Sequence, residues 1–278
     1  MLHATIELAR RIERAEIDFC ALAGAQGTYG RVASLDVGGG RALFSRAGSP
    51  LNKVLGLGLQ GPVSDSELDR LEAFYASRRS LAQVELCPLA HADVARRLCE
   101  RGFVLQGFEN ELATEIGPTD GGPGPQQDAG VRVMPAAADA AETWARVTAE
   151  GFAAAEHDPG APPESYTIEQ LIAMMRQFLH PSIRHYLAWV DGKPAGGVAT
   201  WTYDRILGIF GASTLPQFRR RGVQTAVTRF VLEAARGEAD VAIATTAPGS
   251  TSQRTHERLG FHVLYTRAIL LKELGGRS

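Results

Sequence analysis

The sequence predicts a mixed α/β (α+β) protein made of two similar domains, each with a mixed, mostly antiparallel sheet flanked by helices. Three observations predict it. Hydrophobic periodicity over residues 131–278 gives the element order β-α-α-β-β-β-α-β-α-β, and residues 1–116 give a weaker version of the same order. Residues 117–130 are rich in glycine and proline and lack the large apolar residues that a core requires. We therefore expect domains over 1–116 and 131–278, joined by a flexible linker over 117–130.

The elements of the C-terminal half follow from their patterns in chain order. Strands alternate in polarity or are rich in β-branched residues, and helices repeat apolar residues at a spacing of three or four. Asp191-Gly192 is a turn sequence that predicts a hairpin. The expected elements are strand 131–135, helices 137–152 and 166–179, strands 185–190, 195–203 and 205–214, a helix within 215–230, strand 240–247, helix 251–259 and strand 260–273.

The N-terminal half repeats the second part of this order. Ser64 and Glu67 form a capping-box pattern at the start of a helix over 64–79, which strand 82–87 and the segment 91–103 follow. When this half is moved forward by 158 residues, Gly102-Phe103 falls on Gly260-Phe261, and the strand before, the helix between and the strand after coincide as well. A duplicated domain explains this match.

Composition excludes several classes of protein. The 278 residues are 45% hydrophobic and 22% charged with a net charge of −2, which is typical of a soluble globular protein and gives no global attraction to nucleic acid or an anionic membrane. There is no apolar run near 18 residues, and 1–19 has the pattern of an amphipathic helix rather than a signal peptide. Cys20, Cys87 and Cys99 lack metal-ligand spacing and indicate buried thiols in a cytoplasmic protein without a metal. The oligomeric state, monomer or homodimer, stays open.

One stretch concentrates positive charge at the start of a helix. Arg219, Arg220 and Arg221 precede Gly222, and no Asp or Glu occurs in residues 215–230. A helix N-terminus has unpaired N–H groups and the positive end of the helix dipole, so it binds phosphate well. Gly222 lets the backbone approach a ligand without a Cβ in the way. The strand before and the helix after favour an anion cradle over a solvated basic turn.

Two other phosphate-binding patterns do not fit. The Walker A pattern is absent, which argues against an ordinary ATPase. The glycines Gly56, Gly58 and Gly61 match a dinucleotide fingerprint, but Pro62 follows the last glycine, and Asp65, Glu67 and Asp69 would repel a pyrophosphate.

The segment Arg219-Arg220-Arg221-Gly222-Val223-Gln224 resembles the R-x-x-G-x-G/A loop of the GNAT superfamily of acyl-CoA-dependent N-acyltransferases, with Gln224 in the last position as a departure. Pro216 lies where these proteins often have a proline, and 247–261 is similar to their second signature, a short helix that ends in aromatic-x-x-x-Gly-Phe. The resemblance covers about 131–273, and residues 1–116 resemble a degenerate copy. It implies curved sheets and acetyl-CoA, or another acyl-CoA, as co-substrate. The implied cofactor-binding residues are Ala212, Ser213, Thr214, Arg219, Arg220, Arg221, Gly222, Val223, Gln224 and Thr225.

Acyl transfer to an amine needs a base for the amine, a donor for the oxyanion and an acid for the leaving thiolate. The family commonly has a tyrosine as that acid, and His256 stands at its position here. Tyr265 is a second candidate for the acid. Glu156, His157 and Asp158 lie in a loop where this fold usually forms the acceptor wall, and Glu85 could face the acceptor cleft. No general base stands out.

Three functions remain open at this stage. The leading one is an N-acetyltransferase that moves an acetyl (acyl) group from acetyl-CoA to a primary amine of a small molecule or peptide, by direct transfer in a ternary complex, with only the C-terminal copy loaded. The second is a non-catalytic acyl-CoA-binding sensor, which the histidine in place of tyrosine favours. The third is an aminoacyl-tRNA-dependent transferase, and the near-neutral charge argues against it.

Overall fold

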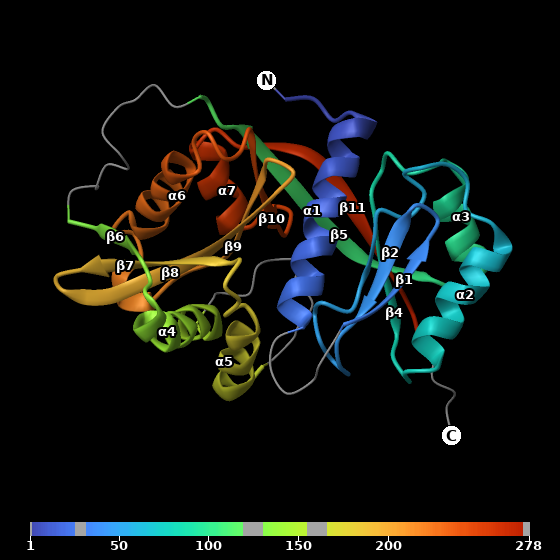
Figure 1. The fold of residues 1–278 in the computed structure, drawn as a ribbon, viewed down its shortest axis with the longest axis horizontal. Coiled ribbons are helices and arrows are strands. Elements are labelled where there is room, and N and C mark those ends of the chain that lie inside the picture. Colours follow the sequence, from blue (N-terminus) through green and yellow to red (C-terminus); the bar gives the residue numbers. More distant parts are fainter. Residues whose placement is uncertain (1, 26–31, 119–129, 155–165, 275–278) are drawn as a thin grey trace. The chain divides into compact units, whose positions relative to one another are not determined.

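A computed structural model describes residues 2–25, 32–118, 130–154 and 166–274 (Figure 1). The chain divides into two compact units. We call residues 112–262, with Met1–Leu2, the C-terminal unit, and residues 3–111 together with 263–278 the N-terminal unit. None of the described helices is long and apolar enough to cross a bilayer. Within the same residues, no cluster of His, Cys, Asp and Glu side chains could hold a metal ion.

The C-terminal unit has a sheet with the strand order β6-β7-β8-β9-β10, in which the first three pairs are antiparallel and β9 pairs with β10 in parallel. The predicted hairpin is confirmed, because β7 and β8 pair up to the turn Asp191-Gly192, where both residues have positive φ. Its elements are β6 (Arg132–Pro135), α4 (Ala141–Ala153), α5 (Ile168–Gln177), β7 (Arg184–Val190), β8 (Lys193–Tyr203), β9 (Ile206–Thr214), α6 (Val223–Ala234), β10 (Val241–Thr246) and α7 (Thr251–Arg258).

Helices cover both faces of this sheet, with α4 and α5 below the strands and α6 and α7 above them in Figure 1. Trp144 of α4 is fully buried, and its indole N–H donates to the carbonyl of Val198 on β8 at 3.0 Å. On α6, Phe230 packs edge-on against Tyr186 of β7, with 5.7 Å between the ring centroids. Burial of these aromatic rings and the indole hydrogen bond hold both helix layers on the strands between them.

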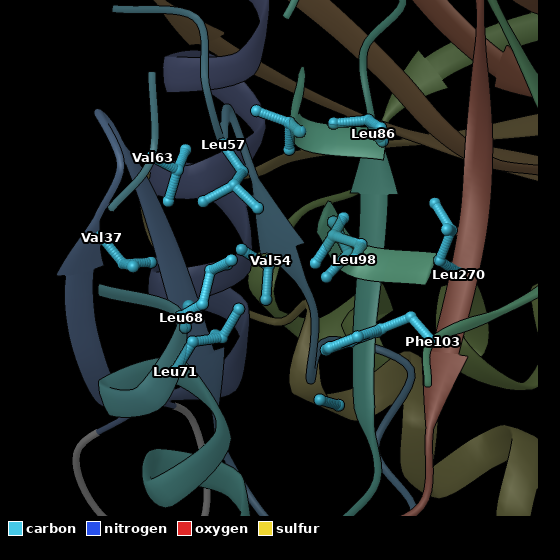
Figure 2. Close-up of a cluster of buried hydrophobic side chains, with 14 of the residues drawn as sticks. Val37, Val54, Leu57, Val63, Leu68, Leu71, Leu86, Leu98, Phe103 and Leu270 are labelled. Carbon is cyan, nitrogen blue, oxygen red and sulfur yellow. The ribbon is translucent and has the colours of Figure 1, made fainter. Parts of the chain in front are cut away.

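The N-terminal unit has the strand order β1-β2-β3-β4-β11. Its core joins Leu68 and Leu71 of α2, Leu98 of α3, Val54 of β3 and Leu270 of β11 (Figure 2). Ser64 and Glu67 form the predicted capping box at the start of α2. The elements are α1 (Ile6–Gly24), β1 (Ala33–Val37), β2 (Gly40–Phe44), β3 (Val54–Leu55), α2 (Asp65–Ala76), β4 (Ala82–Leu86), α3 (Asp93–Glu100) and β11 (His262–Lys272); β5 (Val104–Glu115) runs from this unit into the other.

The duplication extends to the bounds of the helices. Moving α2 forward by 158 residues gives the bounds of α6, and moving α3 by the same number gives the bounds of α7. Gly102 and Gly260 then coincide, and both are left-handed, with φ of 86° and 87°. Phe103 and Phe261, which follow them, are both buried. The α+β fold of two similar domains is therefore confirmed.

The last strand belongs to the N-terminal unit. Apart from its first residue, β11 groups with residues 3–111, and it pairs antiparallel with β4 from Ala268 opposite Leu86 to Lys272 opposite Ala82. The sequence-based division assigned this strand to the domain 131–278 and so differs from the structure at this point. The pattern of a strand gives its faces but not its partner, which the whole sheet decides. Most of the predicted linker, 119–129, lies outside the described residues.

Candidate functional site

The neighbouring parallel strands β9 and β10 are paired over only part of their length. Their register runs from Ile206 opposite Val241 to Gly208 opposite Ile243, whereas β9 continues to Thr214 and β10 to Thr246. Beyond Gly208, the facing edges of the two strands are outside this ladder. Backbone N–H and C=O groups at such edges are available to an extended ligand.

A bulge lies on β9 within the same stretch. Gly197 of β8 faces Ser213, but Ala199 faces Phe210, so that Val198 alone lies opposite two residues, Gly211 and Ala212. Gly211 has a φ of 63°, a conformation that glycine adopts without strain. The bulge bends the strand just before Ala212, Ser213 and Thr214, of which Ser213 and Thr214 stay paired with Gly197 and Gly196. These are the three residues that the sequence analysis expected beside the pantetheine arm.

Helix α4 is pressed against the bulge. A Cβ on Gly151 would lie 2.6 Å from Ser213 Oγ, so only glycine permits this approach. Ser213 Oγ donates to the carbonyl of Thr148 at 3.1 Å. No sequence motif indicated Gly151, Thr148 or Gly211 as part of the site. The two glycines of the predicted strand 205–214 were the available signal, because glycine inside a strand marks bulges and close approaches.

The cationic loop continues from the end of β9. A short 3₁₀ turn, Pro216–Phe218, leads to the arginines, and Gly222 begins α6 as its N-cap with a φ of 77°. The first intrahelical bond is from Ala226 N to Gly222 O. The amides of Val223, Gln224 and Thr225 precede it and have no partner within the helix. The first turn of α6 contains no acidic residue, so its positive dipole end is not neutralised from within the turn.

The three arginines differ in their contacts. Arg219 Nη2 donates to the carbonyl of Ala154 at 2.6 Å, and Ala154 is the C-cap of α4. Arg221 Nη2 lies 3.0 Å from Asp191 Oδ2 in the β7–β8 turn. Arg220 is exposed and has a φ of 60°, an uncommon conformation for a residue with a Cβ. That all three bind phosphate stays a prediction, and in this structure Arg219 caps the end of α4.

His256 lies on the buried side of α7, with only 2% of its surface exposed. Its Nδ1 is 2.9 Å from the carbonyl of Ser252, and a carbonyl can only accept, so Nδ1 carries the proton. Nε2 therefore has a lone pair, and it has no hydrogen-bond partner among the described residues. Burial lowers the pKa of His256. The side chain is thus a neutral acceptor rather than an imidazolium in the free protein.

Two other candidate residues, Tyr265 and Glu85, belong to the N-terminal unit. Both are buried there, where the Tyr265 hydroxyl donates to Glu13 and Lys53 pairs with Glu85. Glu85 is thus not a cleft residue of the site described above. The candidates Glu156, His157 and Asp158 lie outside the described residues. The expectation of three buried thiols is wrong for Cys99, which is exposed on α3.

The N-terminal unit lacks the features of this site at the equivalent positions. The shift of 158 residues places Ser64 on Gly222 and Leu98 on His256. The carboxylate of Glu67 already accepts from Ser64 N and Ser64 Oγ at 2.8 and 2.7 Å, and from Gly38 N at 3.0 Å. In return, Ser64 Oγ accepts from Glu67 N at 3.3 Å, so an internal carboxylate and hydroxyl cap the start of α2, whereas Gly222 gives α6 no side-chain cap.

Comparison with known proteins agrees with this geometry. Residues 140–261 match the acetyltransferase (GNAT) family. Over 97% of this chain and 96% of the other, the structure is similar to a GCN5-related N-acetyltransferase from Kribbella flavida, with 22% identity and a TM-score of 0.67. A tandem GNAT protein from the clavulanic acid biosynthesis pathway is 16% identical over 100% of this chain and 98% of its own, with a TM-score of 0.58. At these identities the structural likenesses establish the fold, and no curated protein matches the sequence.

Proposed function

We propose that this chain, which has the GNAT fold and a GNAT acetyltransferase domain at residues 140–261, transfers an acetyl or other acyl group from acyl-CoA to a primary amine. One observation carries the proposal: β9 parts from β10 at Gly208, bulges at Gly211-Ala212 and leads into the cationic loop at the start of α6. An extended thioester with a pyrophosphate at one end fits that order of groups. The acceptor is a small molecule or a peptide, and the reaction is direct transfer in a ternary complex.

The residues present fit the co-substrate. The edge from Ile209 to Thr214 can bond the amides of a pantetheine arm, and the amides of Val223, Gln224 and Thr225 can bond a pyrophosphate. Arg220 and Arg221 add charge beside those amides. When bound, acyl-CoA supplies the activated acyl group. We assign its binding to the C-terminal unit alone, because the capping box of Ser64 and Glu67 places an internal carboxylate at the start of the equivalent helix α2.

His256 is our candidate for moving the proton. Its Nδ1–H is bonded to Ser252, and its Nε2 lone pair is free to accept a proton from the attacking amine. As the carbon–nitrogen bond forms and the carbon–sulfur bond breaks, Nε2 gives that proton to the departing thiolate. His256 would therefore act as an acid only after it has acted as a base, because burial disfavours a resident charge.

Calorimetry with CoA and acetyl-CoA, followed by turnover on a panel of amines, amino acids and peptides, tests the proposal. We expect one site per chain and acetylation of at least one class of amine. Two equivalent sites, or no binding, would contradict it.

A second candidate is a non-catalytic acyl-CoA sensor. The histidine in place of a tyrosine favours it, because Nε2 has no proton to donate to a thiolate in the free protein. Tight binding of acyl-CoA without turnover on any acceptor would support the sensor, and turnover would exclude it. An aminoacyl-tRNA-dependent transferase is less favoured, since a net charge of −2 does not suit tRNA binding.

A further inference from the structure

An arginine is completely buried in the N-terminal unit. Arg267 of β11 has no exposed surface, and carboxylates surround its guanidinium. Its Nε donates to Glu13 Oε1 at 2.8 Å, and Nη2 also contacts Glu16, both on α1. Nη1 lies 3.2 Å from Glu111 on β5 and 4.0 Å from Glu85 on β4. We call these five side chains, with Lys53, the Arg267 cluster.

Lys53 is the second cation of the cluster. Its Nζ lies 2.6 Å from Glu85 Oε1, and the amide of Gln83 donates to the same oxygen at 2.9 Å. Glu85 is therefore held as a carboxylate. Although burial opposes ionisation, Lys53 and Arg267 lower the pKa of Glu85 below its usual value.

The charges of the cluster do not balance. Glu16 is partly exposed, so water can solvate its charge, but Glu13, Glu85 and Glu111 are each at most 2% exposed. Three buried carboxyls face two cations, Arg267 and Lys53. An unpaired charge in a dry interior is so costly that such a group takes up a proton instead. One of the three buried carboxyls should therefore be neutral.

The contacts of these carboxyl groups indicate which of them is neutral. Burial raises the pKa of both Glu13 and Glu111. Three donors converge on Glu13, namely Arg267 Nε, the Tyr265 hydroxyl at 3.1 Å and Gly56 N at 2.8 Å, and they favour its ionised form. Glu111 contacts the guanidinium at the longer distance of 3.2 Å. Glu111 is thus the better position for the proton.

We propose that the Arg267 cluster stores one proton on Glu111 and that the attachment of strand β11 to the N-terminal unit therefore weakens as the pH rises. The ionisable groups that face Glu111 include Glu13 and Glu16 of α1, Glu109 of β5, and Arg267 of β11. Lys53 and Glu85 complete the cluster, and Cys20 and Cys87 are neutral thiols because burial raises the pKa of each to about 12.

The direction follows from linkage. Glu111 keeps its proton while the strand is attached and loses it above its ordinary pKa of 4.5 once the strand detaches. For each unit of pH above that value, the equilibrium constant for detachment therefore rises by about tenfold. The rise ends when Glu111 loses its proton in the attached form too. Glu109 acts in the same direction below about pH 7, because burial raises its pKa to about 7. Glu111 alone should give the dependence above pH 7.

Hydrogen exchange of the whole protein, read by mass spectrometry on peptides from residues 263–272, tests the proposal. After correction for the intrinsic exchange rate, we expect the opening constant of these amides to rise from pH 7 to pH 8, by at most about tenfold. Peptides from β8, in the C-terminal unit, provide the internal reference and should change less. A pH-independent opening constant for β11 in the unmodified protein would overturn the proposal without any variant.

Two substitutions of the same kind separate a stored proton from an ion pair. Glu111→Gln mimics the neutral form, so it should remove the rise between pH 7 and 8 and leave β11 at least as protected at pH 8 as in the unmodified protein. Glu85→Gln removes an ionised partner of Lys53, so protection should fall at least tenfold at pH 7, and the rise should shrink because two buried carboxyls then face two cations. If Glu111→Gln instead loses protection at pH 7 as Glu85→Gln does, Glu111 is an ordinary ion-pair partner and the proposal fails.

Discussion

Replacing Gly222 with valine tests the anion cradle most directly. Gly222 has a φ of 77°, and among the described residues a Cβ there would meet no atom within 4 Å. The variant therefore loses only the backbone preference, about 1–2 kcal/mol for a residue with a Cβ in this conformation. The chain should fold, with its side chain placed where a phosphate must approach the amides that begin α6.

The effect on binding should be much larger than the effect on stability. A hydrogen bond to a charged group contributes about 1.5–3 kcal/mol. Losing two such bonds costs about 3–6 kcal/mol, or about 10²- to 10⁴-fold in affinity. Calorimetry with CoA measures this loss, and urea unfolding measures the stability of the same sample.

Gly102 offers a matched control. It has a φ of 86° and equally open surroundings among the described residues, and it ends α3 in the unit to which we assign no cofactor. Gly102→Val should show the same loss of stability with unchanged CoA affinity. A folded Gly222→Val protein that binds CoA as tightly as the unmodified one would refute the cradle.

The other predictions concern charge and the proton. Arg220→Ala should weaken CoA binding about 10- to 150-fold at low salt and less at high salt, because its charge is exposed; equal affinities at low salt would make it a mere surface residue. Asp191→Asn should strengthen CoA binding up to about fivefold, since it frees Arg221 from an exposed ion pair of at most about 1 kcal/mol; weaker binding would contradict this. His256→Leu introduces the leucine that the N-terminal copy has at the equivalent position, Leu98. It should keep CoA affinity but lower turnover about 10²- to 10⁴-fold. Because Nε2 must be unprotonated and burial lowers its pKa, the rate should rise with pH to a plateau with a midpoint below 6.5; a midpoint above 6.5 would exclude His256 as the group titrated.

Local signals in the sequence predicted much of the fold. The capping box at Ser64 and Glu67 located α2, and the turn at Asp191-Gly192 located the β7–β8 hairpin. Both depend on residues close together in the chain, where one conformation is strongly favoured. The start of a helix beside Gly222 was likewise predicted from the strand before it and the apolar spacing after it, whereas the positive φ of Gly222 is known from the structure alone.

Features that depend on pairing were not predictable in the same way. The bulge at Gly211-Ala212 is a mismatch between two strands, so neither strand shows it alone. Glu85 was interpreted as a residue of the acceptor cleft, whereas its partners, Lys53 and Arg267, are distant in the sequence. Arg219 was expected on phosphate, and the sequence contains no sign of the carbonyl of Ala154 that it caps. Which polar groups meet in a protein interior is decided by tertiary packing.

The assignment of β11 to the N-terminal unit has a consequence for biosynthesis. A ribosome makes residues 3–111 early, but the strand that borders β4 and adds Leu270 to their core is made last. Until then the edge of β4 is open, and an open strand edge invites pairing with other chains. The N-terminal unit therefore cannot complete its sheet until residues 263–272 have been synthesised. A stop codon placed after Phe261 would remove this strand and so destabilise the N-terminal unit.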